Sequence, residues 1–191
     1  MKSVIVTGAS TGIGWGICKI LTRQGFRVLG SVRKAADGAR LQAEFGANFI
    51  PLVFDITDIA AVQAGAREAR TLLAGEPLFA LVNNAGIAVP GPLLYLGIED
   101  FRHQIEVNLT GQLIVTQAFA PLMDKGGRIV MMSSVGGSSG TPFVGAYNAS
   151  KFALEGLSEA LRRELMLLGI DVIIIAPGAV ATPIRDKGDA M

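Results

Sequence analysis

Short apolar runs, rich in β-branched residues, recur six times along the chain. They occupy residues 4–6, 27–32, 49–54, 78–82, 128–132 and 171–176. Runs that are apolar throughout, instead of alternating with polar residues, are typical of parallel strands covered on both faces. The pattern therefore predicts a parallel sheet of six strands.

The stretches between these runs have the spacing of helices. Three of them end on a glycine just before the next strand, at Gly25, Gly46 and Gly169, as expected where a helix closes in the left-handed conformation. Alternating strands and helices with right-handed crossovers predict an α/β, doubly wound (Rossmann-like) sheet in the order 3-2-1-4-5-6, with helices on both faces. Two long helices are expected at 98–123 and 147–168. The second carries a leucine stripe that should face the sheet: Leu154, Leu157, Leu161, Leu165 and Leu168.

Length and composition favour one globular domain over residues 1–191. Half of the residues are hydrophobic, 17% are charged, and the formal net charge is +1. This balance gives no reason to expect a nucleic-acid or anionic-membrane partner, and the apolar runs are too short to span a membrane. A small-molecule partner is expected. Residues 1–3 lead directly into the first strand, which leaves no room for a signal peptide, so we expect a cytoplasmic protein. Cys18 is the single cysteine, which excludes an intrachain disulfide and a thiolate metal cluster, and no metal is predicted.

A glycine-rich turn separates the first strand from the first helix. It runs Thr7-Gly8-Ala9-Ser10-Thr11-Gly12-Ile13-Gly14. Glycines allow a tight turn and let a pyrophosphate approach the first amides of the helix, where the helix dipole favours anions. Because it occupies the required strand-turn-helix position, the turn predicts a dinucleotide site, although a merely tight turn is the alternative.

The pattern Tyr147-x-x-x-Lys151 carries candidate acid–base chemistry. On a helix these residues lie one turn apart on one face. A phenol exchanges protons poorly at neutral pH unless a nearby cation stabilises its anion, and Lys151 can supply that cation. Ser134, thirteen residues earlier, could hydrogen-bond the oxygen that gains or loses the proton. The alternative is a chance pattern with a packed tyrosine and a solvated lysine.

Together, the glycine turn and the tyrosine–lysine pair resemble the short-chain dehydrogenase/reductase family, over nearly the whole chain. The resemblance implies an NAD(P)-dependent oxidoreductase that interconverts a carbonyl and an alcohol, with Tyr147 as general acid/base. Lys151 would then also hold the nicotinamide ribose, Ser134 would polarise the carbonyl, and Asn108 would hold a water in a proton relay. His103 is expected to be a surface helix residue.

The end of the second strand indicates which cofactor is used. In family members that prefer NAD, an acid there holds the ribose 2′-hydroxyl, but Val32 occupies that position and Arg33 follows. A guanidinium suits a 2′-phosphate, so NADP(H) is predicted, with a solvated basic loop as the alternative. Asp55 matches the family's acid that faces the adenine amino group. Alternatively, Asp55 or Asp58 could cap the next helix.

Two further segments match family signatures after strands 4 and 6. The first is Asn83-Asn84-Ala85-Gly86 and the second runs from Pro177 to Thr182. The resemblance implies that the first keeps the backbone close to the cofactor and that the second holds the nicotinamide carboxamide. The cofactor-binding residues predicted overall are Gly8, Ser10, Thr11, Gly12, Ile13, Gly14, Arg33, Asp55, Asn83, Ala85, Gly86, Tyr147, Lys151, Pro177, Gly178, Val180 and Thr182.

The chain departs from the family at its end. Family members usually continue through a substrate-covering segment and a seventh strand, whereas this sequence stops at Met191, and residues 185–189 are expected to begin a lid. A redox-inactive NADP(H)-binding regulatory module is therefore the competing function. An epimerase or dehydratase is disfavoured, because such proteins carry a longer substrate domain. The apolar residues at 89–94 suggest an apolar carbonyl or alcohol substrate, and the family suggests a homodimer or homotetramer.

Overall fold

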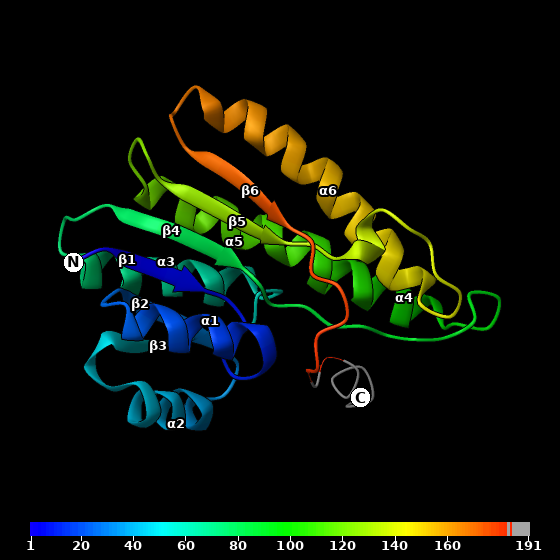
Figure 1. Cartoon of the computed structure of the whole chain (residues 1–191), viewed down its shortest axis with the longest axis horizontal. Helices are drawn as coiled ribbons and strands as arrows, with labels where there is room; N and C mark the ends of the chain where they lie inside the picture. Colours follow the sequence, from blue (N-terminus) through cyan, green and yellow to red (C-terminus); the bar gives the residue numbers. More distant parts are fainter. Residues whose placement is uncertain (183, 185–191) are drawn as a thin grey trace.

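The computed structural model describes residues 1–182 and Ile184. Its centre is a sheet of six parallel strands in the order β3-β2-β1-β4-β5-β6 (Figure 1). The strands are β1 (Ser3–Val6), β2 (Arg27–Val32), β3 (Phe49–Val53), β4 (Leu78–Asn83), β5 (Arg128–Met132) and β6 (Asp171–Ile175). The predicted strand order is confirmed, and the strand ends differ from the predicted ones by one residue or none.

Helices cover both faces of the sheet, as predicted. They are α1 (Gly12–Arg23), α2 (Ala35–Phe45), α3 (Ile59–Leu73), α4 (Ile98–Ile105), α5 (Gly111–Phe119) and α6 (Gly145–Met166). Successive strand residues point to opposite faces. Val4 and Val6 accordingly pack in one apolar cluster with residues of α1 and α2. Ile5 packs in the other, with residues of α3, α5 and α6.

The segment predicted as one helix over 98–123 is interrupted. Between α4 and α5 lies a π-helical turn, Glu106–Thr110, and after α5 comes a 3-10 turn, Ala120–Leu122. Asn108 lies at the middle of the π-helical turn and is completely buried. A π-turn accommodates one more residue than an α-helical turn and is frequent at functional sites.

The leucine stripe of α6 faces the sheet only in part. Leu154 is completely buried, and Leu157, Leu161 and Leu165 pack partly buried against the same cluster. Leu168 is 62% exposed, so its predicted packing is wrong. The reason is that α6 ends at Met166, and Leu168 lies in the turn that Gly169 closes at φ +68°.

Among the helices in the part of the chain that the structure describes, none combines the length and the apolar character that a membrane span needs.

Candidate active site

The predicted site residues gather at one edge of the sheet. Because all six strands are parallel, their carboxyl ends meet there. Thr7 follows β1, Arg33 follows β2, Asp55 lies just beyond β3, Ser134 lies just beyond β5, and Asn83 ends β4. The strand order reverses between β1 and β4, where ligands bind in open sheets of this kind.

The glycine turn needs residues without side chains. Gly8 and Gly12 have φ values of +66° and +61°, which other residues rarely adopt. A Cβ on Gly14 would lie 2.3 Å from the carbonyl oxygen of Gly8. The turn therefore brings the start of α1 as close to β1 as backbone atoms allow.

The first turn of α1 fits a phosphate group. Thr11 precedes the helix, and no side chain of the described residues caps it. The Thr11 hydroxyl oxygen is buried and has no hydrogen-bond partner among those residues. A buried hydroxyl and uncapped amides at a helix N-terminus suit an anion, so the residues present fit the pyrophosphate of a dinucleotide.

Two residues that the sequence analysis did not select hold this turn against β4. The hydroxyl oxygen of Thr7 accepts the N–H groups of Asn84 at 2.9 Å and Ala85 at 3.0 Å. The side-chain amide of Asn84 donates to the carbonyl oxygens of Thr7 at 2.9 Å and Gly8 at 3.4 Å. Ala85 is then so close that a Cβ on Gly8 would lie 2.8 Å from its Cα. Thr7 and Asn84 therefore fix the spacing between turn and strand.

Arg40 of α2 reaches the same turn, which the sequence did not indicate. Its guanidinium donates to the carbonyl oxygen of Ser10 at 2.8 Å and lies 3.5 Å from the Asp37 carboxylate. Nothing in the spacing of 30 residues between Ser10 and Arg40 could have revealed this contact.

Asn83 is placed apart from the other predicted cofactor residues. Its side chain is 1% exposed and donates to the Thr116 hydroxyl at 2.8 Å. The side chain supports the central strand from within the core. Because its side chain is in the core, only the backbone of Asn83 could contact the cofactor, and that contact stays a prediction.

The ends of β2 and β3 carry Arg33 and Asp55. Arg33 is exposed and makes no ion pair with the described residues, whereas Val32 is buried. One carboxylate oxygen of Asp55 accepts the N–H and the hydroxyl of Thr57, at 2.9 and 2.8 Å. Asp58, not Asp55, caps α3 by accepting the N–H of Ala61 at 2.9 Å. Of the two residues considered as helix caps, Asp58 is therefore the one that caps α3.

Tyr147 and Lys151 lie in the first two turns of α6, as predicted. Lys151 is 5% exposed, and its ammonium lies 5.7 Å from the centre of the Tyr147 ring and donates to the carbonyl oxygen of Met132 at 2.7 Å. Burial lowers the pKa of Lys151 from 10.5 to about 8, an effect that the negative charge of Glu155 opposes. The alternative of a solvated lysine is wrong, because the sheet and α6 enclose this side chain.

Ser134, Tyr147 and Asn148 converge on Gly136. A Cβ on Gly136 would lie 2.8 Å from the Asn148 amide nitrogen, 3.2 Å from the Tyr147 ring and 3.5 Å from the Ser134 hydroxyl. The Ser134 hydroxyl oxygen accepts the N–H of Gly136 at 3.1 Å. Asn148, which was not selected from the sequence, donates to the carbonyl oxygen of Gly136 at 2.9 Å. The structure thus brings the predicted serine and tyrosine to one point.

Asn108 is linked to Tyr147 through Ser150, and its side chain makes three hydrogen bonds. It accepts the N–H of Ile87 at 2.9 Å and donates to the carbonyl oxygen of Ile87 at 3.0 Å and to the Ser150 hydroxyl at 3.1 Å. Ser150 in turn donates to the carbonyl oxygen of Tyr147 at 2.7 Å. The chain of contacts ties the π-helical turn to the first turn of α6.

Comparison with known proteins agrees with this geometry. Residues 2–191 match the family model described as short chain dehydrogenase. The chain belongs to the short-chain dehydrogenase/reductase family of oxidoreductases.

Curated relatives of this short-chain dehydrogenase include two bacterial reductases. It is 38% identical over 193 residues to the NADPH-dependent 3-dehydrocapnine reductase of Ornithobacterium rhinotracheale, covering 98% of this chain and 68% of that one. It is also 38% identical to the 3-amino-tetrahydro-pyrrolizinone reductase of Xenorhabdus hominickii, covering 97% of this chain and 64% of that one.

Among solved structures, a short-chain dehydrogenase/reductase from Burkholderia phymatum in complex with NAD superimposes with a TM-score of 0.92 at 28% identity. The match covers 99% of this chain and 69% of that chain. The sequence therefore spans about two thirds of the length of these relatives. The relatives include both an NADPH-dependent reductase and an NAD complex, so they leave the cofactor preference open.

The segment after β6 of this short-chain dehydrogenase lies next to the residues that follow β5. The carbonyl oxygen of Pro177 accepts the N–H of Val135 at 3.1 Å, which holds the segment beside Ser134. Gly178, Val180 and Thr182 follow, and Val180 is 51% exposed. The expected lid at 185–189 lies outside the described residues.

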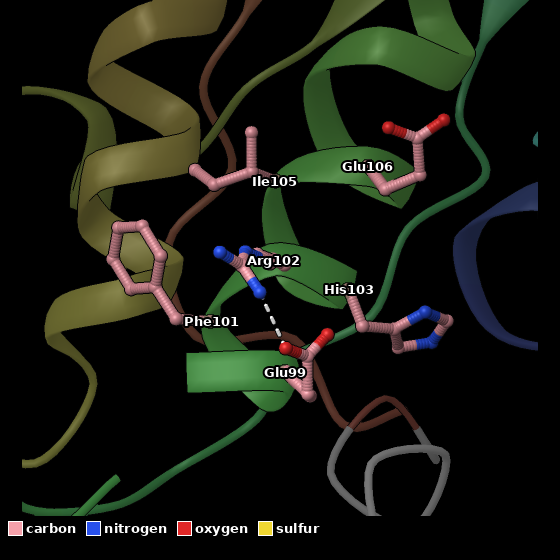
Figure 2. Close-up of a pocket in the computed structure, with 6 residues that line it drawn as sticks. All are labelled: Glu99, Phe101, Arg102, His103, Ile105 and Glu106. Atoms are coloured by element: carbon pink, nitrogen blue, oxygen red, sulfur yellow. Dashed lines mark hydrogen bonds and ion pairs between the residues drawn. The ribbon is translucent and has the colours of Figure 1, made fainter. Parts of the chain in front are cut away.

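A cavity of about 530 Å³ lies elsewhere, along α4 of the same protein. Figure 2 shows its lining residues, among them Arg102 paired with Glu99, and His103 and Glu106 on one side of the helix. His103 lies on α4, as predicted, and is half-buried. The cavity contains none of the predicted catalytic residues.

Proposed function

We propose that this protein is an NADP(H)-dependent oxidoreductase that interconverts a carbonyl and an alcohol. The observation that carries the proposal is the buried ammonium of Lys151 one helical turn from Tyr147, with Ser134 beside the same ring. A proton-transfer group with a cation and a hydrogen-bonding hydroxyl beside it, next to a phosphate-fitting turn, suits redox chemistry at a carbon–oxygen bond.

The cofactor would be held by three regions. The glycine turn with Thr11 would bind the pyrophosphate, Asp55 would face the adenine, and the segment 177–182 would hold the nicotinamide. Arg33 would pair with a 2′-phosphate, because it is exposed at the strand end where binding of NAD calls for an acid. NADP(H) is also the cofactor named for the Ornithobacterium relative. When bound, the cofactor supplies or accepts a hydride.

The side chains would handle the proton. Tyr147 would donate its hydroxyl proton to the substrate oxygen during reduction and take it back during oxidation. Ser134 would donate a hydrogen bond to the same oxygen. With a pKa of about 8, Lys151 is mostly cationic at neutral pH, and its charge stabilises the tyrosinate that remains after the transfer.

Asn108 enters the proposal as a support for α6. Family resemblance assigns it a water in a proton relay. Its two side-chain N–H groups are taken by the carbonyl oxygen of Ile87 and the Ser150 hydroxyl, so a relay water would have to donate to an oxygen of Asn108. Asn108 would then act by holding the first turn of α6, which carries Tyr147, through Ser150.

A regulatory module that binds NADP(H) without turnover is the second candidate. In both candidates residues 1–191 form one domain and the cofactor site is the same. They differ in whether a substrate is converted.

Assembly and location are also part of the proposal. The face of α6 away from the sheet exposes Phe152 at 48% and Met166 at 69%, which supports a homodimer or homotetramer built through this helix. A monomeric mass by light scattering would argue against it. We propose a cytoplasmic location, which cell fractionation would test.

The test is NADPH consumption with a panel of ketones, aldehydes and quinones, run in parallel with Tyr147→Phe. The matched control is Tyr95→Phe, because Tyr95 is the other tyrosine and is 80% exposed. The proposal expects turnover in the native protein and the control, and a loss of about a hundredfold or more in Tyr147→Phe. Equal rates in all three would refute Tyr147 as the proton donor. NADPH binding without any turnover would favour the regulatory module.

A further inference from the structure

Polar side chains four residues apart line the buried side of the helical segment from α4 to α5. They are Gln104, Asn108, Gln112 and Thr116, with exposed fractions of 0, 0, 1 and 3%. Burying an amide without hydrogen bonds is costly, and each of these side chains makes at least one, although the side-chain oxygen of Gln112 has no partner among the described residues. All four find partners in the segment at the end of β4 and directly after it.

The partners follow one another two residues apart. Gln104 accepts the N–H of Val89 at 2.7 Å and donates to the carbonyl oxygen of Ile87 at 2.9 Å. Asn108 hydrogen-bonds to both the N–H and the carbonyl oxygen of Ile87, as described above. Gln112 donates to the carbonyl oxygen of Ala85. We call these three side chains and their contacts with residues 85–89 the amide ladder.

The amide ladder advances four residues along the helix for every two residues along the segment 85–89. Four residues of helix advance about 6 Å, which two residues of chain can span because an extended residue covers about 3.3 Å. In a regular α-helix, however, a step of four residues overshoots one turn by about 40°. The π-helical turn at Glu106–Thr110 takes up an additional residue, which reduces that drift and keeps Gln104 and Asn108 on the same side. The amide ladder therefore gives a structural reason for the π-helical turn.

The segment held by the ladder joins the two halves of the candidate site. At its start, Ala85 bonds to Thr7 beside the glycine turn. At its far end, the N–H of Gly91 donates to the carbonyl oxygen of Phe143 at 2.7 Å, two residues before α6 begins. Because β4 ends at Asn83, residues 85–89 have no neighbouring strand within the sheet, and the ladder takes that place.

We propose that Gln104 is a positioning residue for the reaction. It fixes the backbone of residues 87–89, and through Gly91 the start of α6, so that substrate and Tyr147 meet in reactive geometry. Gln112, at the other end of the ladder, holds Ala85 beside the glycine turn and positions the cofactor instead. The positioning role of Gln104 rests on the proposed function, because it concerns turnover. The hydrogen bonds of the ladder do not depend on that function.

The kinetic test replaces Gln104 with methionine, which has similar length but no amide. Gln117→Met is the matched control, since Gln117 lies exposed on α5. The measurements are kcat per folded molecule, with the best carbonyl substrate of the panel, and the Kd for NADPH. For Gln104→Met we expect kcat to fall about tenfold or more, because small displacements of reacting groups have large effects, and Kd to stay within about twofold. Native kcat in Gln104→Met, or a loss in Kd alone, would overturn the assignment.

A second variant separates positioning from mere stability. In Gln104→Glu the carboxylate still accepts the N–H of Val89, but it donates to the carbonyl oxygen of Ile87 only when protonated. Its kcat relative to that of the native protein should therefore rise as the pH falls. A ratio that does not change with pH would contradict the role of the Ile87 contact. The pH dependence of Gln104→Glu tests the positioning role even if Gln104→Met does not fold.

Hydrogen exchange tests the ladder without any turnover. The amide of Val89 should exchange slowly in the native protein and about tenfold faster or more in Gln104→Met, while Gln117→Met matches the native rate. Fast exchange in the native protein would overturn the ladder. If no panel compound is converted but the exchange behaves as expected, the proposed function fails and the ladder stands.

Discussion

Replacing Lys151 with methionine removes a cation that the fold keeps almost completely out of water. The side chain is 5% exposed and donates to the carbonyl oxygen of Met132. Burial lowers its pKa from 10.5 to about 8. Between these two pH values the unfolded chain binds more protons than the folded one, so the free energy of unfolding of the native protein should rise with pH.

The expected size follows from the pKa difference. A change from 10.5 to about 8 corresponds to about 3 kcal/mol. Urea unfolding followed by circular dichroism, repeated from pH 7 to pH 10.5, gives the free energy of unfolding of the native protein and of Lys151→Met. The native value minus the variant value should increase by about 3 kcal/mol over this range, because methionine has no proton to lose.

The control is Lys34→Met, since Lys34 is exposed at the start of α2. Lys34→Met removes a lysine without opening the enclosed site, so the rise of the native-minus-variant difference should be specific to Lys151→Met. Parallel pH profiles for native protein and Lys151→Met would refute the reasoning. Such a result would mean that water reaches the ammonium and that the site is not enclosed as described.

Three further predictions concern the glycine turn, cofactor choice and the cysteine. Gly14→Ala should lower the free energy of unfolding, measured in urea, by about 1–3 kcal/mol, because its Cβ would lie 2.3 Å from a backbone oxygen. The control is Gly16→Ala, whose Cβ meets nothing within 4 Å. Its free energy of unfolding should rise by about 0.5–1 kcal/mol. Arg33→Ala should raise the Kd for NADPH about tenfold to a hundredfold, with NADH unaffected, in fluorescence titrations; equal losses for both cofactors, or the same loss in the exposed Arg67→Ala, would contradict a 2′-phosphate contact. Burial raises the pKa of the Cys18 thiol to about 12, so iodoacetamide at pH 8 should label it only after unfolding in urea; rapid labelling of the folded protein would contradict its burial.

Much of the fold was predictable because its signals are local. Apolar runs and helix-closing glycines indicated the six strands, and their alternation with helices, joined by right-handed crossovers, predicted the strand order. The π-helical turn was not predicted, since it depends on the partners of Asn108 at Ile87 and Ser150. Leu168 was misplaced because periodicity alone does not show where a helix ends.

The candidate site was predictable where chemistry and spacing coincide in one short motif. Tyr147, Lys151 and the glycine turn are of this kind. The contacts of Asn84 and Arg40 with the glycine turn were not predicted, because these residues lie 76 and 30 positions away from their partners in the sequence. The partners of Gln104 could not be predicted either, since a helical glutamine gives no sign of being buried until the neighbouring segment is placed.

Transfer of deuterium from the cofactor tests the central claim most directly. The protein is incubated with NADPH that carries deuterium at C4 on one ring face, and with the carbonyl compound that it converts best. Mass spectrometry of the alcohol product should show one deuterium on the former carbonyl carbon for one labelled face and none for the other, and Tyr147→Phe should yield almost no product. Alcohol that forms without deuterium from either face would contradict a hydride transfer at this site.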